Sequence, residues 1–461
     1  MKKIITLLFV ALTVATLSSC EKFLNKEPIS DLGANLFWQD ATDVSSARAA
    51  MYAAFANAMS VNFYDWGEVR GENYEGHQSS PIRKEELMSD DIPDDNSACS
   101  WTELYRAINR ANLIIKHVPE ITPAPSNANM VIAEAYTMRA LCYFYAVRVW
   151  GDVPHFIEAV EQFDRETCIK EKESSAKILE TILSDLETAE GLFSIPSSSI
   201  ERCYLNLGAA FALEMDVHAW MHDYAKAISV YENKLQSLPT AVFDFKSFTP
   251  TGNDDESAIK WRDITMDDTS DKEVFFAVRY NKSVDGTENG WRLMFGYSGE
   301  QLEVRATTLD AFEEGDIRRA GTFREASGTT TYTYMEKFRT WNISNTEGYP
   351  ENDYIMYRVS DIMLLYAEAL VQQNRIGDAL AVVNKIRTRA NLSGLPTSLS
   401  KAEAADAVLK ERRMELFGEG KYWFDLVRTG NAQKLAGCPD SKIPFPIHRD
   451  HVLQNTKLAL N

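Results

Sequence analysis

Apolar residues return every three or four positions along two long stretches of this 461-residue chain. The first stretch covers about 40–238, and the second covers about 357–430. Because an α-helix has about 3.6 residues per turn, this spacing gives each segment one apolar face that must be buried against a neighbour. The sequence therefore predicts a mainly α-helical scaffold in which helices pack in pairs.

Two short segments are similar to each other and indicate how the predicted helices pair. Met221–Ile228 and Gln373–Leu380 each place a polar turn before a helix that carries a small residue, Ala227 or Ala379. A small side chain lets the next helix approach closely, as in tetratricopeptide repeats. We therefore predict tetratricopeptide-like helical hairpins.

The helical spacing disappears between about 239 and 350, where Gly, Thr, Asp and Ser become frequent. Val274–Tyr280 and Thr331–Met335 are typical of short strands. Long irregular segments on a rigid scaffold often carry binding residues. We expect a loop-rich, ligand-facing insertion with a few short strands, and the alternative is a small β insertion with a structural role only.

The N-terminus has the pattern of a secretory signal. Two lysines precede an apolar run, which Leu17-Ser-Ser-Cys20 closes. The run is shorter than the roughly 20 residues that a membrane-spanning helix needs. Leu-Ser-Ser-Cys resembles a bacterial lipobox, so we expect 1–19 to be a signal peptide, Cys20 to be acylated, and 20–461 to form a single domain. The alternative is a plain secreted protein with a chance cysteine at this position.

The charge balance limits the partners. The chain has 48 Lys and Arg against 67 Asp and Glu, a formal net charge of −19. Removal of 1–19 takes two lysines and leaves 46 bases, 67 acids and a net charge of −21. Nucleic-acid binding is excluded because it needs clustered bases. Membrane attachment must come from lipid, and anionic polymers are disfavoured unless Arg70 and Arg292 make a local positive patch.

Sequence motifs of catalysis and metal binding are missing. The chain contains no HExxH, GxSxG, Walker loop, GxGxxG or CxxC, so we expect no catalytic residue, no cofactor and no metal. The acidic runs Asp90–Asp95 and Asp254–Glu256 lack EF-hand spacing and are predicted to be solvated loop charge. His218 and His222, four positions apart, are predicted to be surface or core histidines.

Longer motifs resemble a known family. In the N-terminal half they are Cys20–Leu24, Trp101–Asn112, Glu134–Ala140 and Trp150–Pro154. In the C-terminal half they are Tyr357–Ala369, Val383–Ala390, Glu411–Leu416, Glu419-Gly420, Asp425–Arg428 and Phe445–Ile447. In this order the motifs resemble the SusD/RagB family of outer-membrane nutrient-binding lipoproteins.

The resemblance implies a function and a location. It implies a non-catalytic lipoprotein, anchored in the outer membrane and facing outside, that binds oligosaccharide and hands it to a SusC-like TonB-dependent transporter. Some family members handle peptides, so a peptide-binding member is one alternative. A lipoprotein glycosidase is another, since a carboxylate pair is defined only in space, and a scaffold with protein partners alone is a third. The chain is short for the family, and its tail, Gln454–Asn461, lacks the longer Gln-Asn-Pro-Gly ending.

Glycan binding needs flat aromatic faces for sugar rings and planar polar groups for hydroxyls. Two stretches outside the predicted helices supply this mixture. The candidate ligand-binding residues are Tyr64, Trp66, Arg70, Asn73 and Tyr74 in the first stretch, and Trp291, Arg292, Tyr297 and the later Trp341 in the second. Loops in comparable positions tend to bind ligand in the family, but these residues match no fixed motif, and each aromatic ring could instead pack under its own loop.

Overall fold

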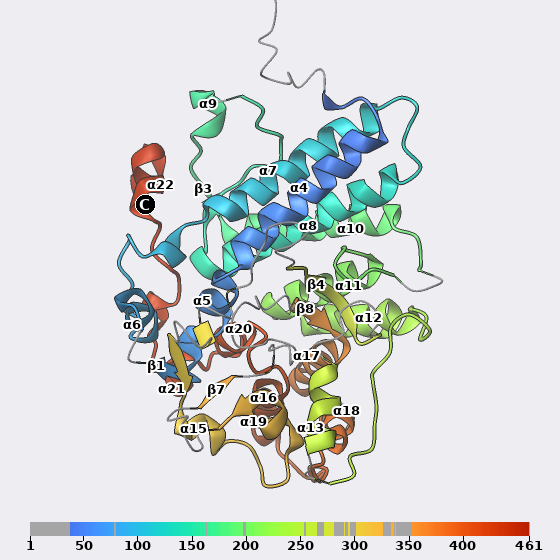
Figure 1. Cartoon of the computed structure of the whole chain (residues 1–461), viewed down its shortest axis with the longest axis vertical. Coiled ribbons are helices and arrows are strands. Elements are labelled where there is room, and N and C mark those ends of the chain that lie inside the picture. Colours follow the sequence, from blue (N-terminus) through green and yellow to red (C-terminus); the bar gives the residue numbers. More distant parts are fainter. Residues whose placement is uncertain are drawn as a thin grey trace, which may run out of the picture.

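The structure is a computed structural model, and it is mainly helical (Figure 1). It describes residues 37–77, 80–162, 164–196, 200–252, 255–264, 272–280, 290, 294–295, 301–325, 333–335, 337 and 353–460. Among these residues, no helix combines the length and the apolar character needed to cross a bilayer. The predicted fold class is confirmed.

Four long helices form the upper part of the molecule in Figure 1. They are α4 (Ala41–Met59), α7 (Thr102–His117), α8 (Ala128–Trp150) and α10 (Ser175–Leu192). Helix α4 begins at a capping box in which the Asp40 side chain accepts from Asp43 N–H and the Asp43 side chain accepts from Asp40 N–H. Helix α8 contacts both α7 and α10 and is buried on almost every side, so it is the centre of this group.

A second helical group follows and contains the predicted hairpins. Its helices are α11 (Leu207–Trp220), α12 (Tyr224–Asn233), α17 (Val359–Gln372), α18 (Ile376–Arg389), α19 (Lys401–Glu415) and α20 (Tyr422–Arg428). The α11–α12 and α17–α18 turns have the same geometry, with His222 at φ 59° and Asn374 at φ 61°. Ala227 and Ala379 are fully buried, which confirms the close-contact role predicted for them.

Short elements complete the fold. The short helices are α5 (Asn62–Gly67), η1 (Val69–Gly71), α6 (Ile82–Met88), η2 (Ser97–Cys99), η3 (Val118–Glu120), α9 (Arg165–Cys168), η4 (Leu235–Ser237), α13 (Asp255–Asp263), α15 (Ala306–Leu309), α16 (Ile317–Thr322), α21 (Ala432–Ala436), η5 (Asp440–Lys442), α22 (Arg449–Gln454) and η6 (Thr456–Leu460). The strands form antiparallel pairs: β1 (Tyr74–Gly76) with β5 (Leu302–Val304), β2 (Val153–Pro154) with β3 (Lys172–Glu173), β4 (Val274–Val278) with β8 (Tyr354–Arg358), and β6 (Phe323–Arg324) with β7 (Tyr334–Met335).

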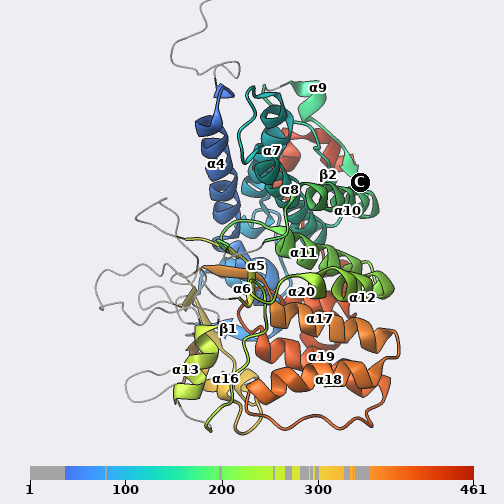
Figure 2. The same cartoon turned by 90° about the vertical axis from the view of Figure 1, so that its right-hand side faces the viewer.

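The region 239–350 is less irregular than its composition suggests. Strand β4 matches the first predicted strand, and β7 lies within the second, whose first two residues are outside the described residues. Helices α13 and α16 pack against each other in the lower part of the molecule (Figure 2). One continuous apolar cluster extends from Val44 to Leu458 and joins both helical groups.

Charged side chains form a buried network in the C-terminal half. The Glu415 Oε1 atom accepts from Arg358 at 2.7 Å and from Arg389 at 2.6 Å. Both arginines also donate to Glu273, at 3.1 and 2.6 Å, and all four side chains belong to residues no more than 2% exposed. Burial opposes ionisation of Glu415, yet the neighbouring arginines hold its pKa well below the usual range.

A second set of buried charge pairs joins α17, α19 and α20. Arg412 donates to Asp361 and to Asp425, each at 2.9 Å, and Arg428 joins Asp425 to Glu368 at 2.7 Å. Burial raises the pKa of Asp361, but Lys421 and Arg412 outweigh it and hold the pKa at about 2. Many charged residues of the C-terminal motifs that resemble a known family therefore pair with one another inside the protein.

Substitution Glu415→Gln should lower the free energy of unfolding by about 3–5 kcal/mol, because it removes one of the two carboxylates that the buried Arg358 and Arg389 share. Urea unfolding at pH 7 measures this change. Glu180→Gln removes the same charge from an exposed pair with Lys177 and should leave the unfolding midpoint nearly unchanged. Equal stability of the two variants would contradict a structural role for the network.

Acid should weaken the protein through Asp361. Its folded-state pKa of about 2 lies below the ordinary value of 3.8. The carboxylate therefore stabilises the fold fully above about pH 5, and this contribution is lost as the pH falls through about 2. The stability difference between the unmodified protein and Asp361→Asn, measured by urea unfolding, should be largest at pH 6 and smaller at pH 2.5. A difference independent of pH would contradict this assignment.

Candidate functional site

The first predicted ligand-binding stretch lies in the core. Its five candidates, each no more than 2% exposed, are Tyr64, Trp66, Arg70, Asn73 and Tyr74. The stretch folds as α5 and η1, which pack against α20, and α5 also contacts the end of α4. In this conformation these side chains lie behind the surface. Sequence reasoning missed the short helices because acidic and glycine residues interrupt their apolar spacing.

Specific contacts hold this stretch in place. Trp66 Nε1 donates to the Ala98 carbonyl oxygen at 2.8 Å. Arg70 Nε donates to Asp90 Oδ1 at 2.6 Å, and its guanidinium lies 4.1 Å from the Trp423 ring centroid. Asp90 is therefore paired and is not the solvated loop charge that we predicted. Arg70 is also buried and paired, so it contributes to no positive surface patch.

Two of the acids in the same run are also paired. Arg449 Nη2 lies 3.2 Å from Asp94 Oδ1 and 2.7 Å from Asp95 Oδ2, and these side chains are about half exposed.

The two histidines that are four positions apart are a buried and a hydrogen-bonded residue. His218 is buried, and a ring nitrogen of His222 lies 2.9 Å from the Arg428 carbonyl oxygen. The part of the chain that the structure describes contains no group of three or more His, Cys, Asp or Glu that could hold a metal ion.

The buried stretch also supports the start of the second one. Gly290 N–H donates to the Ser60 carbonyl oxygen at 2.8 Å, just beyond the end of α4. A side chain at Gly290 would place its Cβ 2.3 Å from that oxygen, so this approach requires glycine. The Phe295 ring lies 5.4 Å from Tyr64 and 5.5 Å from Tyr74. The four candidates of the second stretch, and the predicted lipidation site, lie outside the described residues: Trp291, Arg292, Tyr297, Trp341 and Cys20.

Two hollows that share Tyr204 lie beside α4, and we call them together the Tyr204 groove. The first hollow has a volume of about 330 Å³ and is lined by Arg48, Met130, Glu134, Phe193, Ser194, Pro196, Ile200, Glu201, Tyr204, Leu205, Asn206 and Leu207. The second has about 240 Å³ and is lined by Ala49, Tyr52, Ala53, Phe55, Ala56, Cys203, Tyr204, Phe276, Val278 and Arg279. None of the five predicted candidates that the structure describes lines the groove.

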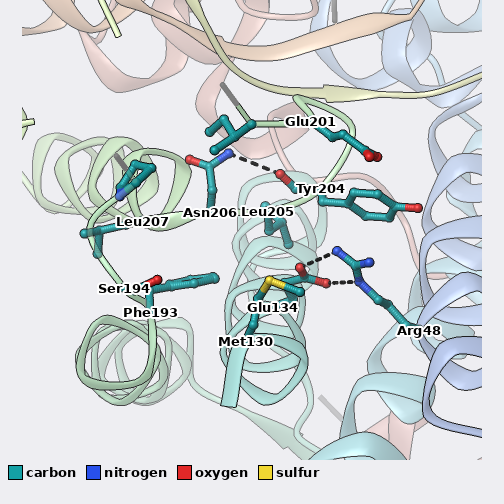
Figure 3. A pocket seen from close by; sticks show the side chains of 12 residues that line it. Arg48, Met130, Glu134, Phe193, Ser194, Glu201, Tyr204, Leu205, Asn206 and Leu207 are labelled. Atoms are coloured by element: carbon teal, nitrogen blue, oxygen red, sulfur yellow. Dashed lines mark hydrogen bonds and ion pairs between the residues drawn. The ribbon is translucent and has the colours of Figure 1, made fainter. Parts of the chain in front are cut away.

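An ion pair between two helices forms one side of the first hollow. Arg48 of α4 donates through Nε and Nη2 to the two carboxylate oxygens of Glu134 of α8, both at 2.6 Å. The Arg48 guanidinium lies 3.6 Å from the centroid of the Tyr204 ring, a cation–π contact. Figure 3 shows Tyr204 between Arg48 and Glu201.

Burial and charge act in opposite directions on this pair. Burial raises the pKa of Glu134, and the hydrogen bonds from Arg48 oppose that rise. Burial disfavours the Arg48 cation, but the hydrogen bond and charge of Glu134 outweigh it and raise the pKa of Arg48. The guanidinium is therefore a fixed cation whose charge a neighbouring carboxylate already balances.

Neighbouring residues hold the Tyr204 ring in position. The Leu205 N–H donates to the Tyr52 hydroxyl at 2.8 Å, and the Tyr52 and Tyr204 rings meet edge to face at 5.1 Å. Asn206 caps α11 by accepting from Ala209 N–H and donates to the Tyr204 carbonyl oxygen at 3.1 Å. An oriented aromatic ring beside polar groups is a suitable binding surface for a sugar ring.

A signal for this groove was present in the sequence. Tyr204 and Asn206 lie in a short connection before a helix, close to the acidic Glu201. An aromatic residue beside an acid and an amide is the same mixture of aromatic and polar side chains that suggested glycan binding in the two predicted stretches. What the sequence could not show is that Arg48 and Glu134, which are 86 positions apart, meet below this connection.

Comparisons with known proteins agree with this architecture. The SusD family profile matches residues 218–443, and a second profile, described as starch-binding associating with outer membrane, matches residues 22–214. The SusD-like protein P38 of Formosa agariphila is 29% identical over 517 aligned positions, which cover all of this chain and 99% of that protein. A SusD-like protein of Bacteroides ovatus is 23% identical, with 91% of this chain and 82% of that protein covered.

Solved structures show the same fold. The structure of B. fragilis NanU superposes with a TM-score of 0.77 at 20% identity, covering 94% of this chain and 98% of that one. A laminarin binding SusD-like protein superposes with a TM-score of 0.75 at 21% identity, covering 90% and 98%. The helical hairpins and the two matching profiles define a SusD-like protein, a class linked to starch binding at the outer membrane. The chain belongs to the SusD/RagB family, which confirms the resemblance seen in its motifs.

Substitution Trp66→Ala should act on folding, because it removes a large side chain from a site that is 1% exposed. We expect the free energy of unfolding to fall by about 3–5 kcal/mol, the usual range for deleting a buried aromatic side chain. Urea unfolding measures the loss. Leu453→Ala, at a position that is 77% exposed, is the control and should change stability little. Unchanged stability of Trp66→Ala would contradict the core position of this residue.

Proposed function

We propose that this protein is a non-catalytic outer-membrane lipoprotein that binds oligosaccharide and hands it to a SusC-like TonB-dependent transporter. In this proposal 1–19 is a signal peptide, Cys20 carries the lipid anchor, and the binding face points away from the cell. The family match to proteins described as starch-binding and associated with the outer membrane supports the ligand class and the location.

The observation that carries the proposal is the Tyr204 groove. An aromatic ring is held there by Tyr52 and Arg48, and the hollow beside it combines apolar walls with a few polar groups. Small-ligand sites in proteins have this composition. The laminarin binding relative with this fold supports a carbohydrate as the occupant.

The second predicted stretch belongs to the same proposal. The groove follows α4 as far as Ala56, and Gly290 is held at Ser60, one helical turn further along. Trp291 and Arg292 follow Gly290 directly in the chain. We therefore keep Trp291, Arg292, Tyr297 and Trp341 as proposed ligand contacts.

Affinity electrophoresis of the soluble mature protein in gels that contain single polysaccharides tests the proposal. At least one glycan should retard the unmodified protein. Tyr204→Ala and Trp291→Ala should each weaken that retardation by about tenfold in dissociation constant, equal to about 1.4 kcal/mol, because each loses a stacking surface. Tyr224→Ala, which alters a half-buried ring on α12, is the matched control and should bind like the unmodified protein.

Other outcomes would favour the alternatives. Absence of retardation by every glycan, together with binding of peptides, would replace the carbohydrate by a peptide ligand. Release of reducing ends from a bound glycan would show an enzyme. Co-purification with protein partners and no soluble ligand would indicate a scaffold.

A further inference from the structure

Arg48 is the one basic side chain among the described lining residues of the first hollow, and it is already paired with Glu134. Both Arg48 hydrogen bonds to Glu134 are 2.6 Å long, and the guanidinium face rests on the Tyr204 ring. The Glu134 side chain is only 1% exposed. Glu134 thus already neutralises the Arg48 charge, and a ligand carboxylate or sulfate that replaced it would leave Glu134 buried without its arginine, which is costly.

Acidic side chains also lie around the rest of the groove. Glu201 is exposed at the edge of the first hollow. In the second hollow, burial raises the pKa of the Cys203 thiol to about 11; Arg279 opposes this rise, while Asp353 and Glu201 add to it. The negative charges of Asp353 and Glu201 and the positive charge of Arg279 therefore all lie close to Cys203.

The described lining residues supply no excess of positive charge. Arg48 and Arg279 balance Glu134 and Glu201, Asp353 lies close enough to Cys203 to affect its thiol, and the whole chain has a formal net charge of −19. A groove with this balance attracts no anion, and the field of the whole protein repels an anionic polymer before it arrives. Hydrogen bonding and ring stacking, which an uncharged sugar can use fully, are the interactions that remain.

We infer that the Tyr204 groove selects uncharged oligosaccharides and discriminates against glycans that carry uronate, sialate or sulfate groups. The inference rests on the proposed function, because it assigns the substrate class of the same groove. Glu134 and Glu201 are the specificity-determining residues. Glu134 neutralises the guanidinium that an anionic sugar would use, and Glu201 adds repulsion at the entrance.

The test compares neutral and acidic polysaccharides with related backbones, for example galactan with polygalacturonate and xylan with glucuronoxylan. The unmodified mature protein should bind a neutral member and should bind its acidic counterpart at least tenfold more weakly at low salt. Glu201→Gln should raise affinity for the acidic member by about two- to fivefold, an effect that 0.5 M NaCl removes by screening. Affinity for the neutral member should stay the same.

A second variant tests the buried pair. Glu134→Gln leaves the Arg48 guanidinium without its carboxylate and should shift the preference further toward acidic glycans. If this variant does not fold, Glu201→Gln, altered at an exposed position, still decides the question. Glu180→Gln, an equal charge change on the exposed face of α10, is the control and should leave both affinities unchanged.

The outcomes separate this inference from the proposed function. Binding of acidic members as tight as, or tighter than, their neutral counterparts would overturn the inference and leave oligosaccharide binding in place. An unchanged preference in Glu201→Gln would overturn it as well. Binding of no polysaccharide of either kind would contradict the proposed function and the inference with it.

Discussion

The Glu415 carboxylate holds the C-terminal half of this protein together. It accepts hydrogen bonds from Arg358 at the end of β8 and from Arg389 at the end of α18, in a core that excludes water. A buried charge pays a desolvation cost that only well-placed partners offset, so misaligned helices would leave these groups unpaired. The network therefore favours one arrangement of α17, α18, α19 and β8 over other packings of similar apolar faces.

The groove depends on that arrangement through a chain of contacts. The turn after α19 brings Gly420 against Gly67 so closely that a Cβ at Gly67 would lie 2.2 Å from the Gly420 carbonyl oxygen. Gly67 ends α5, and α5 continues from α4, whose last turns carry the second hollow and the Ser60 contact to Gly290. The buried aromatic residues between α4 and α6 thus act as the support of the binding face, which is why a stretch rich in Trp, Tyr and Arg is hidden from solvent.

Features set by local interactions could be predicted from the sequence, and features set by distant contacts could not. Helix spacing is a local property, and the hairpins with Ala227 and Ala379 were predicted from it correctly. The position of α5 depends on contacts with α20, more than 350 residues away, and these contacts bury a stretch whose aromatic content suggested ligand binding. The Tyr204 groove joins segments far apart in the sequence that no local pattern connects, so its residues were not among the predicted candidates.

By itself the sequence determined the helical class, the hairpin repeat, the family and the excess of acidic charge. These follow from periodicity, from motifs and from composition, which need no knowledge of distant contacts. Only the tertiary structure decided which charges are buried in pairs, which aromatic rings are core, and which ring faces a hollow. The physical reason is that burial and charge pairing belong to residues that meet in space, such as Arg48 and Glu134, and solvent accessibility is set only when the helices have packed.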